Sequence, residues 1–517
     1  MIVEIVILLS AAIYAFCKYI ESKTNYFKGR NCKHDTFFPI FGSMKSMTFK
    51  KKSILDVTLE LYQKAEGNKI FGIYENGKPS FYINDPELIR QITVKDFDHF
   101  VNHRDFFTDN DEGALFGKSL FSMKDLKWKH MRSTLSPAFT GSKMRMMFQL
   151  ITDVAQQAVD FMKSKDDIKT GREVDIKDYF THFTNDIIAT VAFGIKVDSL
   201  KDENHEFYEY GKKVMKFDGW QIVKFFIYMN FKFVTRFVDL DIWKRDVVGY
   251  FKRLVLDAMN HRMEHKILRH DMINMLMEAK GMYVDGSSPP ENSKPSHEWT
   301  DSEIVAQCFV FFIAGFDSAA TLMSFVAHEL MENPEVQEKL FREIEEVKES
   351  LDGKPLTYEA CNKLKYMEMV ISETLRKWPT APGTDRVCTK TTTFENPDGL
   401  GDFTIKTGEN VFIPIVGLHR DPMYFPNPTQ FDPERFNEDN KNNIQPSTYI
   451  PFGAGPRACI ANRFALMEAK AILFYLVGEF KLEPSKNSTI PLDLTGGGFQ
   501  LKPKNGFWLK FATRSDE

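Results

Sequence analysis

Cys459 is the residue of this sequence best placed to do chemistry. It lies in "PFGAGPRACIANRFALMEAK", Pro451 to Lys470, where glycine and proline precede the cysteine and apolar residues follow it at helical spacing. Cys459 should therefore lie where a loop becomes a helix. The N-terminus of a helix favours a thiolate, and Arg457 adds a fixed positive charge two residues earlier. A small buried hydrophobic residue is the alternative interpretation of such a cysteine.

The pattern Phe452-x-x-Gly455-x-Arg457-x-Cys459 resembles the heme-thiolate signature of the cytochrome P450 family. The resemblance implies that Cys459 is the axial ligand of the iron of heme b, bound non-covalently. It implies that Phe452 and Arg457 also belong to the cofactor-binding set, with Arg457 at a heme propionate. The family usually has glycine where this chain has Ala461.

Three further residues match cofactor-binding positions of the family. Trp128 and Arg132, in "KWKHMRSTLSPAFT", are four residues apart and should share one helix face, where a surface cation–π pair would be the simplest interpretation. The resemblance instead makes both of them partners of the heme propionates. It assigns the same role to Arg386, in "GTDRVC".

Glu373 and Arg376 lie one helical turn apart, and alone they would be a solvated ion pair. Apolar residues flank them, and Arg435 follows in "PERF". The three resemble the family's buried Glu–Arg–Arg cluster, which has a structural role in holding the heme loop.

Asp317 and Ser318, in "AGFDS", lie within a long apolar run. The glycine before them costs a helix about 1 kcal/mol, and a buried aspartate costs more unless it is paired. Tight helix packing could explain the glycine. The resemblance implies that Asp317 and Ser318 are the catalytic pair that delivers protons, with serine where the family has threonine; Thr321 is the next candidate. Ala314 stands where one branch of the family esterifies heme to a glutamate, so covalent heme is not expected.

The secondary structure that carries these residues is predicted to be mainly helical. The segment "KIFGIYENGKPSFYIND" predicts a β-hairpin turned at Asn76-Gly77, and Asp85-Pro86 predicts a helix start. Thr300-Asp-Ser-Glu303 begins a helix that should cross the interior and end at Asn333-Pro334, and another helix should end at Trp378-Pro379. The predicted fold class is mainly α with a small β part, and the resemblance implies the cytochrome P450 fold, with heme between the long central helix and the cysteine-bearing loop.

Composition excludes several other classes. The chain has 517 residues, a formal net charge of −4 and no basic block, which gives no indication of nucleic-acid binding. Its six cysteines show no Cys-x-x-Cys spacing, which suits a reducing compartment and argues against a zinc or iron–sulfur site.

The N-terminal run "MIVEIVILLSAAIYAFCKYIESK" is strongly apolar up to Cys17. We expect residues 1–20 to be a membrane anchor, residues 21–40 a linker, and residues 41–517 a single catalytic domain. A cleaved signal peptide is the alternative, although the run lacks a basic n-region. The lysines and arginine after the anchor predict that the catalytic domain faces the cytoplasm.

The resemblance implies a heme-thiolate monooxygenase of the endoplasmic reticulum membrane, similar to microsomal detoxification forms of arthropods. It would insert one oxygen atom from O2 into lipophilic small molecules, with NADPH electrons from a reductase and cytochrome b5 as a further partner. Two alternatives are a reductase-independent heme-thiolate isomerase or dehydratase and a non-catalytic heme-binding protein.

Two surfaces of the protein are further hypotheses. A basic docking face for the reductase, or an ordinary solvated helix, would contain Lys127, Lys129, Lys143 and Arg145. The substrate pocket, which should be apolar, would be lined by Phe106, Phe107, Phe309 and Phe316.

Overall fold

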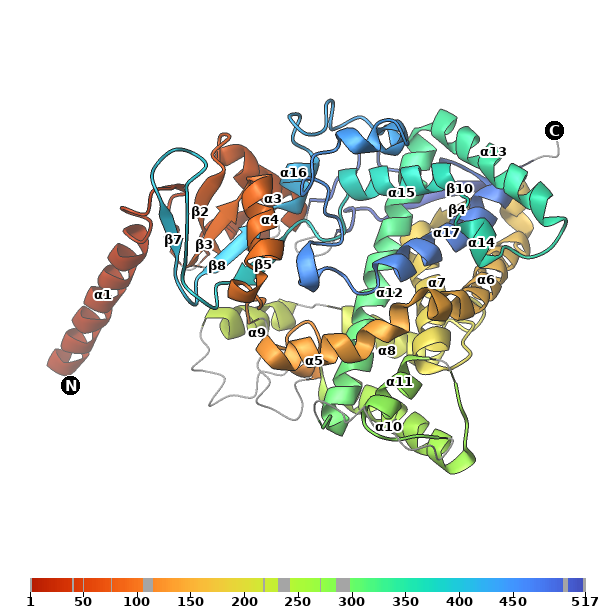
Figure 1. Cartoon of the computed structure of the whole chain (residues 1–517), viewed down its shortest axis with the longest axis horizontal. Helices are drawn as coiled ribbons and strands as arrows, with labels where there is room; N and C mark the ends of the chain where they lie inside the picture. Colours follow the sequence, from red (N-terminus) through yellow and green to blue (C-terminus); the bar gives the residue numbers. More distant parts are fainter. Residues whose placement is uncertain are drawn as a thin grey trace.

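The computed structural model describes residues 2–39, 41–49, 51–75, 77–105, 115–216, 219–230, 242–269, 271–284, 298–495 and 501–514. Most of these residues are helical and a smaller part forms strands, so the predicted fold class is confirmed. Figure 1 shows strands β2, β3, β5, β7 and β8 at the end of the molecule that carries α1 (Ile2–Thr24), while β4 and β10 lie among the long helices at the other end.

The described helices are α1, α2 (Lys45–Thr48), α3 (Ile54–Lys64), α4 (Pro86–Arg90), α5 (Asp125–Leu135), α6 (Gly141–Lys163), α7 (Ile176–Ile188), α8 (Glu206–Met215), α9 (Gly219–Asn230), α10 (Arg245–His265), α11 (Met272–Ala279), α12 (Asp301–Glu332), α13 (Pro334–Leu351), α14 (Tyr358–Cys361), α15 (Lys365–Lys377), α16 (Ile415–His419) and α17 (Asn462–Glu479). The described strands are β1 (Lys33–His34), β2 (Ile70–Glu75), β3 (Lys78–Ile83), β4 (Arg172–Asp175), β5 (Thr384–Val387), β6 (Thr392–Phe394), β7 (Phe403–Ile405), β8 (Asn410–Ile413), β9 (Phe480–Pro484) and β10 (Trp508–Thr513).

The long central helix α12 forms where the sequence predicts it. Thr300 caps its first turn: the Thr300 hydroxyl accepts from the Glu303 N–H, and the Glu303 carboxylate accepts from the Thr300 N–H. The helix ends before Asn333, and Pro334 starts α13. In Figure 1 α12 runs through the middle of the helical part of the molecule. By length and apolarity α12 is the one helix in the described part of the chain that could cross a membrane, but most of it is buried in the protein, as in a core helix.

The strands form three separate sheets among the described residues. The largest has the order β1-β2-β3-β8-β5, the second β4-β10-β9, and the third pairs β6 with β7. The hairpin β2–β3 is antiparallel with Glu75 opposite Lys78, which confirms the predicted hairpin, and Asn76 of its turn lies outside the described residues. In the same sheet β8 pairs with β3 in parallel, so a strand late in the chain is hydrogen-bonded to an early one.

Close packing of α12 against α7 explains the glycine in the middle of α12. A Cβ on Gly315 would lie 2.8 Å from the Ile188 Cδ1 atom at the end of α7. A methyl group would therefore push the two helices apart. Helix packing therefore requires this glycine, and tight packing was one explanation that the sequence offered for it.

The segment after α1 is bonded to the sheet region. The Tyr26 hydroxyl donates to the Glu409 carboxylate at 2.5 Å, and the Arg30 guanidinium donates to the same oxygen at 2.7 Å. Arg30 also lies over the Tyr26 ring, 4.5 Å from its centroid. In Figure 1 α1 itself extends away from the rest of the molecule.

Candidate active site

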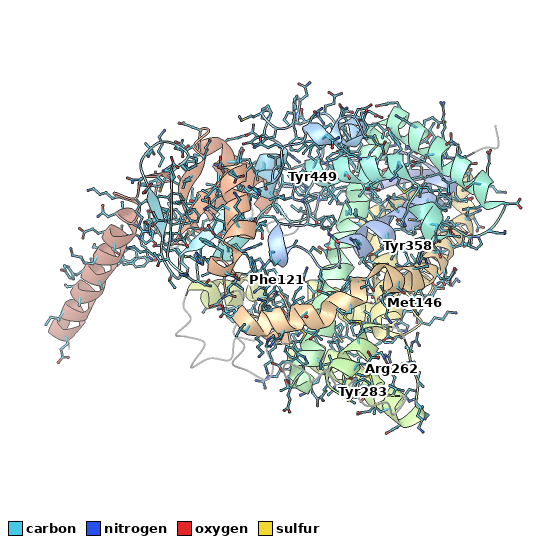
Figure 2. All side chains as sticks on the ribbon, in the orientation of Figure 1. Phe121, Met146, Arg262, Tyr283, Tyr358 and Tyr449 are labelled. Carbon is cyan, nitrogen blue, oxygen red and sulfur yellow. The ribbon has the colours of Figure 1, made fainter. Side chains whose placement is uncertain are left out.

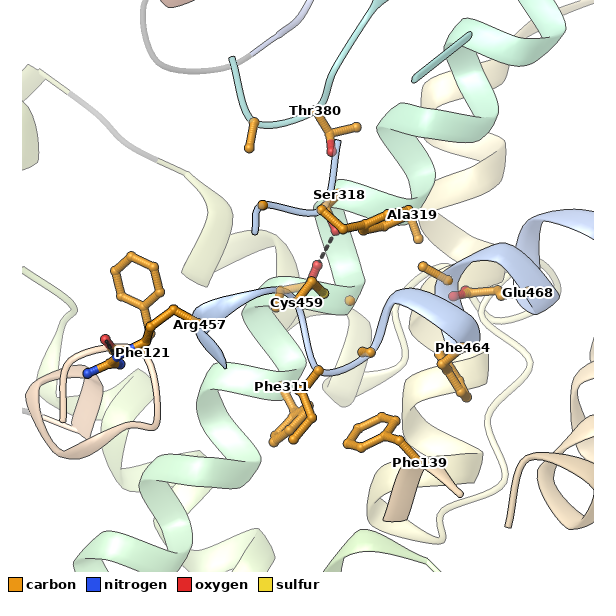
Figure 3. Close-up of a pocket in the computed structure, with 18 of the residues that line it drawn as sticks. Phe121, Phe139, Phe311, Ser318, Ala319, Thr380, Arg457, Cys459, Phe464 and Glu468 are labelled. Carbon is orange, nitrogen blue, oxygen red and sulfur yellow. Dashed lines mark hydrogen bonds between the residues drawn. The ribbon is translucent and has the colours of Figure 1, made fainter. Parts of the chain in front are cut away.

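A cavity of about 610 Å³ lies between α12 and the loop that leads into α17. The Cys459 loop contributes Phe452, Arg457 and Cys459 to its wall, and α12 contributes Ser318. Figure 3 shows these two elements facing each other, with Phe139, Phe311 and Phe464 on the apolar side. The structure thus brings Cys459 and Ser318, 141 residues apart in the sequence, to one space.

The backbone of the cysteine loop is held in a shape that needs glycine. Gly455 has φ +70°, and a Cβ there would lie 1.8 Å from the Thr93 carbonyl oxygen. The loop closes where the Cys459 N–H donates to the Phe452 carbonyl at 2.9 Å. Ala461, by contrast, has φ −98°, a conformation that any residue adopts. Alanine in place of the family's glycine therefore strains nothing in this loop.

The Cys459 thiol faces the cavity at the predicted transition from loop to helix. A short 3₁₀ turn, Gly455–Arg457, precedes it and α17 begins three residues after it. Burial raises the pKa of the Cys459 thiol, while the Ala461 N–H and the charge of Arg132 act against that rise. A metal ion bound to the sulfur would offset this rise in pKa, because the positive charge of the metal stabilises the thiolate and the coordinating thiol loses its proton.

Two arginines beside the cavity, the buried Arg386 and the half-buried Arg457, donate to backbone carbonyls. Arg457 donates to Val101 at 2.8 Å and to Met123 at 2.7 Å, and it lies 4.0 Å from the centroid of the Trp128 ring. Arg386 donates to the Ala454 carbonyl at 3.1 Å, and its Nε has no acceptor among the described residues. Within the described part of the chain, neither guanidinium forms an ion pair with a carboxylate.

The positive charge at this place exceeds what the protein neutralises. Burial, together with the charges of Arg386 and Arg132, lowers the pKa of Arg457 to about 9. Burial likewise lowers the pKa of Arg386 to about 10. The charge of Asp385 favours both cations, but its carboxylate makes an ion pair with neither and accepts from the Arg104 backbone N–H at 2.8 Å. A flat dianionic group such as heme fits this site, because its two carboxylates would compensate these cations.

The predicted cofactor residues differ in how close they come to the cavity. Phe452, Arg457 and Cys459 line it. Trp128 is buried against the Arg457 guanidinium. Arg132 is half-buried close to Cys459. Arg386 lies behind Ala454, to whose carbonyl it donates.

The predicted catalytic pair is divided between two faces of α12. Ser318 lines the cavity, where its hydroxyl donates to the Ala314 carbonyl at 2.5 Å. Asp317 points elsewhere and pairs with Lys177 of α7 at 2.8 Å, with its side chain 44 % exposed. Lys177 also donates to the Thr321 hydroxyl at 2.7 Å. Consecutive helical residues lie about 100° apart, and here Ser318 lies at the cavity while Asp317 is turned towards Lys177.

The aromatic wall comes from a different face of α12 than the sequence suggests. Phe309 and Phe316 are buried in the core and do not line the cavity. Phe311 lines it instead and stacks on Phe139, with ring centroids 5.7 Å apart. The predicted wall residues Phe106 and Phe107 lie outside the described residues.

The predicted Glu–Arg–Arg cluster forms a buried network behind the cysteine loop. Glu373 and Arg376 are fully buried and make two hydrogen bonds of 2.7 Å each. Arg435 lies 3.4 Å from the same carboxylate. Arg376 also donates to the backbone carbonyls of His419 at 3.0 Å and Pro428 at 2.9 Å.

His419, which the sequence analysis missed, connects this network to the cysteine loop. Its Nε2 accepts from the Ile450 N–H at 2.9 Å, directly before Pro451 and Phe452. Burial, with Arg376 nearby, lowers the pKa of His419 to about 3, so the ring stays neutral and can accept. Tyr449, labelled in Figure 2, donates to the backbone of α15 at Ser372 at 3.0 Å. The sequence "GLHRDP" offers a histidine but no indication of its partner.

Glu468 is a second residue that the sequence analysis missed. It lies on α17, is 2 % exposed and lines the cavity, and its Oε1 has no hydrogen-bond partner among the described residues. Burial raises the pKa of its carboxyl to about 8. A polar residue within the buried stripe of a helix was the signal that could have found it.

Comparison with known proteins agrees with this geometry. A family model described as cytochrome P450 matches residues 33–509. The chain is 48 % identical to the probable cytochrome P450 9f2 of Drosophila melanogaster, over all of both chains. It is 40 % identical to cytochrome P450 9e2 of Blattella germanica over 95 % of each, and 33 % identical to cytochrome P450 6k1 of the same species over 98 % of this chain and 97 % of the relative.

Proposed function

The chain belongs to the cytochrome P450 family, whose members bind heme b and are monooxygenases, and we propose that it oxidises lipophilic small molecules with electrons from NADPH. One oxygen atom from O2 would enter the substrate, and a reductase would deliver the electrons. The observation that supports this most is the shared cavity, which has a thiol on one wall, a hydroxyl on another and apolar rings between them.

Heme, when bound, supplies the oxygen-activating chemistry of this site. Cys459 would be its metal ligand, held by the Phe452 carbonyl and by the turn at Gly455. Arg132, Arg386 and Arg457 would hold the two propionates, and Trp128 would support Arg457 from below.

Ser318 is the hydroxyl that could hand a proton into the cavity. Its Oγ both donates and accepts, and it is anchored on α12 by the Ala314 carbonyl. Asp317 faces the solvent side of the same helix, where it can exchange protons with water. We therefore place the proton path across α12, from Asp317 to Ser318, with Lys177 holding the acid in its outward position.

Residues 1–20 would anchor the protein in the endoplasmic reticulum membrane, with residues 21–40 as a linker and residues 41–517 as the catalytic domain in the cytoplasm. The isolated position of α1 in Figure 1 supports an anchor. Reductase and cytochrome b5 would dock on the basic face. Lys127 and Arg145 of that face already pair with Glu303 at 2.6 Å and Glu359 at 2.7 Å, which leaves less free charge for docking.

Reconstitution with a purified NADPH-dependent reductase tests the proposal. A monooxygenase should form product only with NADPH, reductase and O2 together, from a panel of lipophilic compounds. An organic peroxide that is itself rearranged or dehydrated, without reductase and without a second substrate, would instead indicate the isomerase or dehydratase. Heme binding with no turnover in either assay would indicate a carrier.

A further inference from the structure

Gln307, on α12, clamps the segment that precedes α5. It is fully buried, and its Oε1 accepts from the Leu120 N–H at 2.7 Å. Its Nε2 donates to the Lys118 carbonyl at 2.9 Å and to the Glu303 carbonyl of its own helix at 2.8 Å. One amide thus satisfies a donor and an acceptor of a segment that is remote in sequence.

The clamped segment faces the cavity directly. Phe121 follows Leu120, lines the cavity wall and stacks on His103, with ring centroids 4.9 Å apart. Figure 2 labels Phe121 close to the beginning of α5, between the sheet region and the long helices. A shift of the Leu120 backbone would therefore move an aromatic wall of the cavity.

The same segment also carries acceptors for the arginine of the cysteine loop. Arg457 donates to the carbonyls of Leu120 at 3.3 Å and Met123 at 2.7 Å. The Gln307 amide and the Arg457 guanidinium thus hold Leu120 from two sides. A second tie lies at the start of α5, where Lys127 pairs with Glu303 at 2.6 Å.

We propose that Gln307 is a positioning residue for substrate binding, whose amide fixes Leu120 and Phe121 and thereby sets the space open to a bulky ligand. Gln307 is not among the residues that line the cavity, so it should act through the wall, and its effect should grow with the size of the ligand. The proposal rests on the proposed function, because the cavity must hold heme for such ligands to bind.

The test uses two ligands of heme iron that differ in size. Imidazole is small and should be insensitive to the wall, whereas 4-phenylimidazole should meet Phe121. Both are titrated by absorbance into wild type and into Q307M, which keeps the volume of the side chain and removes its hydrogen bonds. We expect the Kd of 4-phenylimidazole to rise about tenfold, since buried backbone groups lose their partners, and that of imidazole to change little.

The chain offers a matched control in Gln337 of α13. Its amide clamps the Leu482 backbone of β9 in the same way, with hydrogen bonds of 2.8 and 3.0 Å, away from the cavity. Q337M should lose similar stability yet keep the wild-type ratio of the two Kd values. Q307E, which keeps the acceptor for the Leu120 N–H, provides a second variant and should lie between wild type and Q307M.

Hydrogen exchange gives a readout that does not need heme. The Leu120 amide should exchange faster in Q307M than in wild type or Q337M. An unchanged Kd ratio in both Gln307 variants, or an equal change in Q337M, would overturn the proposal. Failure of wild type to bind imidazole would refute the heme function itself, which is a separate outcome.

Discussion

Cys459 is the only cysteine in the described cavity wall, so its substitution has a simple spectroscopic prediction. Reduced wild-type protein with CO should show the red-shifted Soret band of a heme thiolate, and Cys459→Ala should lose it. Cys361 and Cys388 are buried away from the cavity, so Cys361→Ala and Cys388→Ala serve as controls and should keep the band. Retention of the band in Cys459→Ala would remove the ligand assignment.

Ser318 should control how well NADPH use is coupled to product. Ser318→Ala removes the one hydroxyl that α12 presents to the described cavity wall, so it should bind substrate normally but release more hydrogen peroxide per product. Ser318→Thr should hold coupling steady or improve it, because a β-branched side chain restricts its rotamer.

The matched control for Ser318 is Ser324, six residues further along α12. Its hydroxyl makes the same type of bond, to the Ala320 carbonyl at 2.6 Å, but is fully buried. Ser324→Ala should leave coupling unchanged. Equal product per NADPH in wild type and Ser318→Ala would exclude this serine from the proton path and would leave Thr321 as the candidate.

Glu468 should make stability depend on pH. Its pKa is about 8 in the folded protein and near 4.5 when exposed, so between these values the folded state holds a proton that the unfolded state has lost. Stability contributed by this group is therefore complete below about pH 4.5 and is lost as pH rises towards 8, by up to about 1.4 kcal/mol per unit.

Glu468→Gln keeps the shape of the side chain and removes the titration. Thermal unfolding at pH 5.5 and pH 8 should show a smaller loss of stability for the variant than for wild type. An identical pH dependence in both proteins would mean that the carboxyl is paired or hydrated in solution.

At the scale of elements, α15, α16 and the cysteine loop act as one unit through Arg376 and His419. Breaking a buried ion pair leaves an uncompensated charge and costs about 3–5 kcal/mol. Glu373→Ala or Arg376→Ala should therefore yield little heme-loaded protein, measured as heme absorbance per protein.

The control is the exposed pair of Glu87 and Arg90, which has the same spacing of three residues and lies at the surface. Arg90→Ala should leave heme content unchanged. Normal heme content in the Arg376 variant would show that the cysteine loop keeps its shape without this network.

At the scale of the whole molecule, the position of α1 predicts that anchor and fold separate. Deletion of residues 1–19 removes most of a helix that extends from the body, and it leaves the bonds of Tyr26 and Arg30 to Glu409 in place. The truncated protein should bind heme normally and associate less with membranes. Sedimentation with microsomes and the CO spectrum measure the two properties, and loss of heme on truncation would mean that α1 belongs to the fold.

Residues close together in the chain specify the local features of this protein. The spacing around Cys459, the cap at Thr300 and the stop at Pro334 each depend on residues within a few positions of one another, and each is found where it was predicted. The family follows from the same short-range patterns, and the comparisons confirm it.

The face of α12 that meets the cavity is set by long-range packing. The helix is apolar on nearly every side, so its periodicity does not select one face, and Phe311 rather than Phe309 or Phe316 lines the wall. The partners of Asp317, Gln307 and His419 also come from remote segments, Lys177, Leu120 and Ile450. A hydrogen bond between remote residues leaves no periodic trace in the chain, because it depends on packing that brings the two segments together.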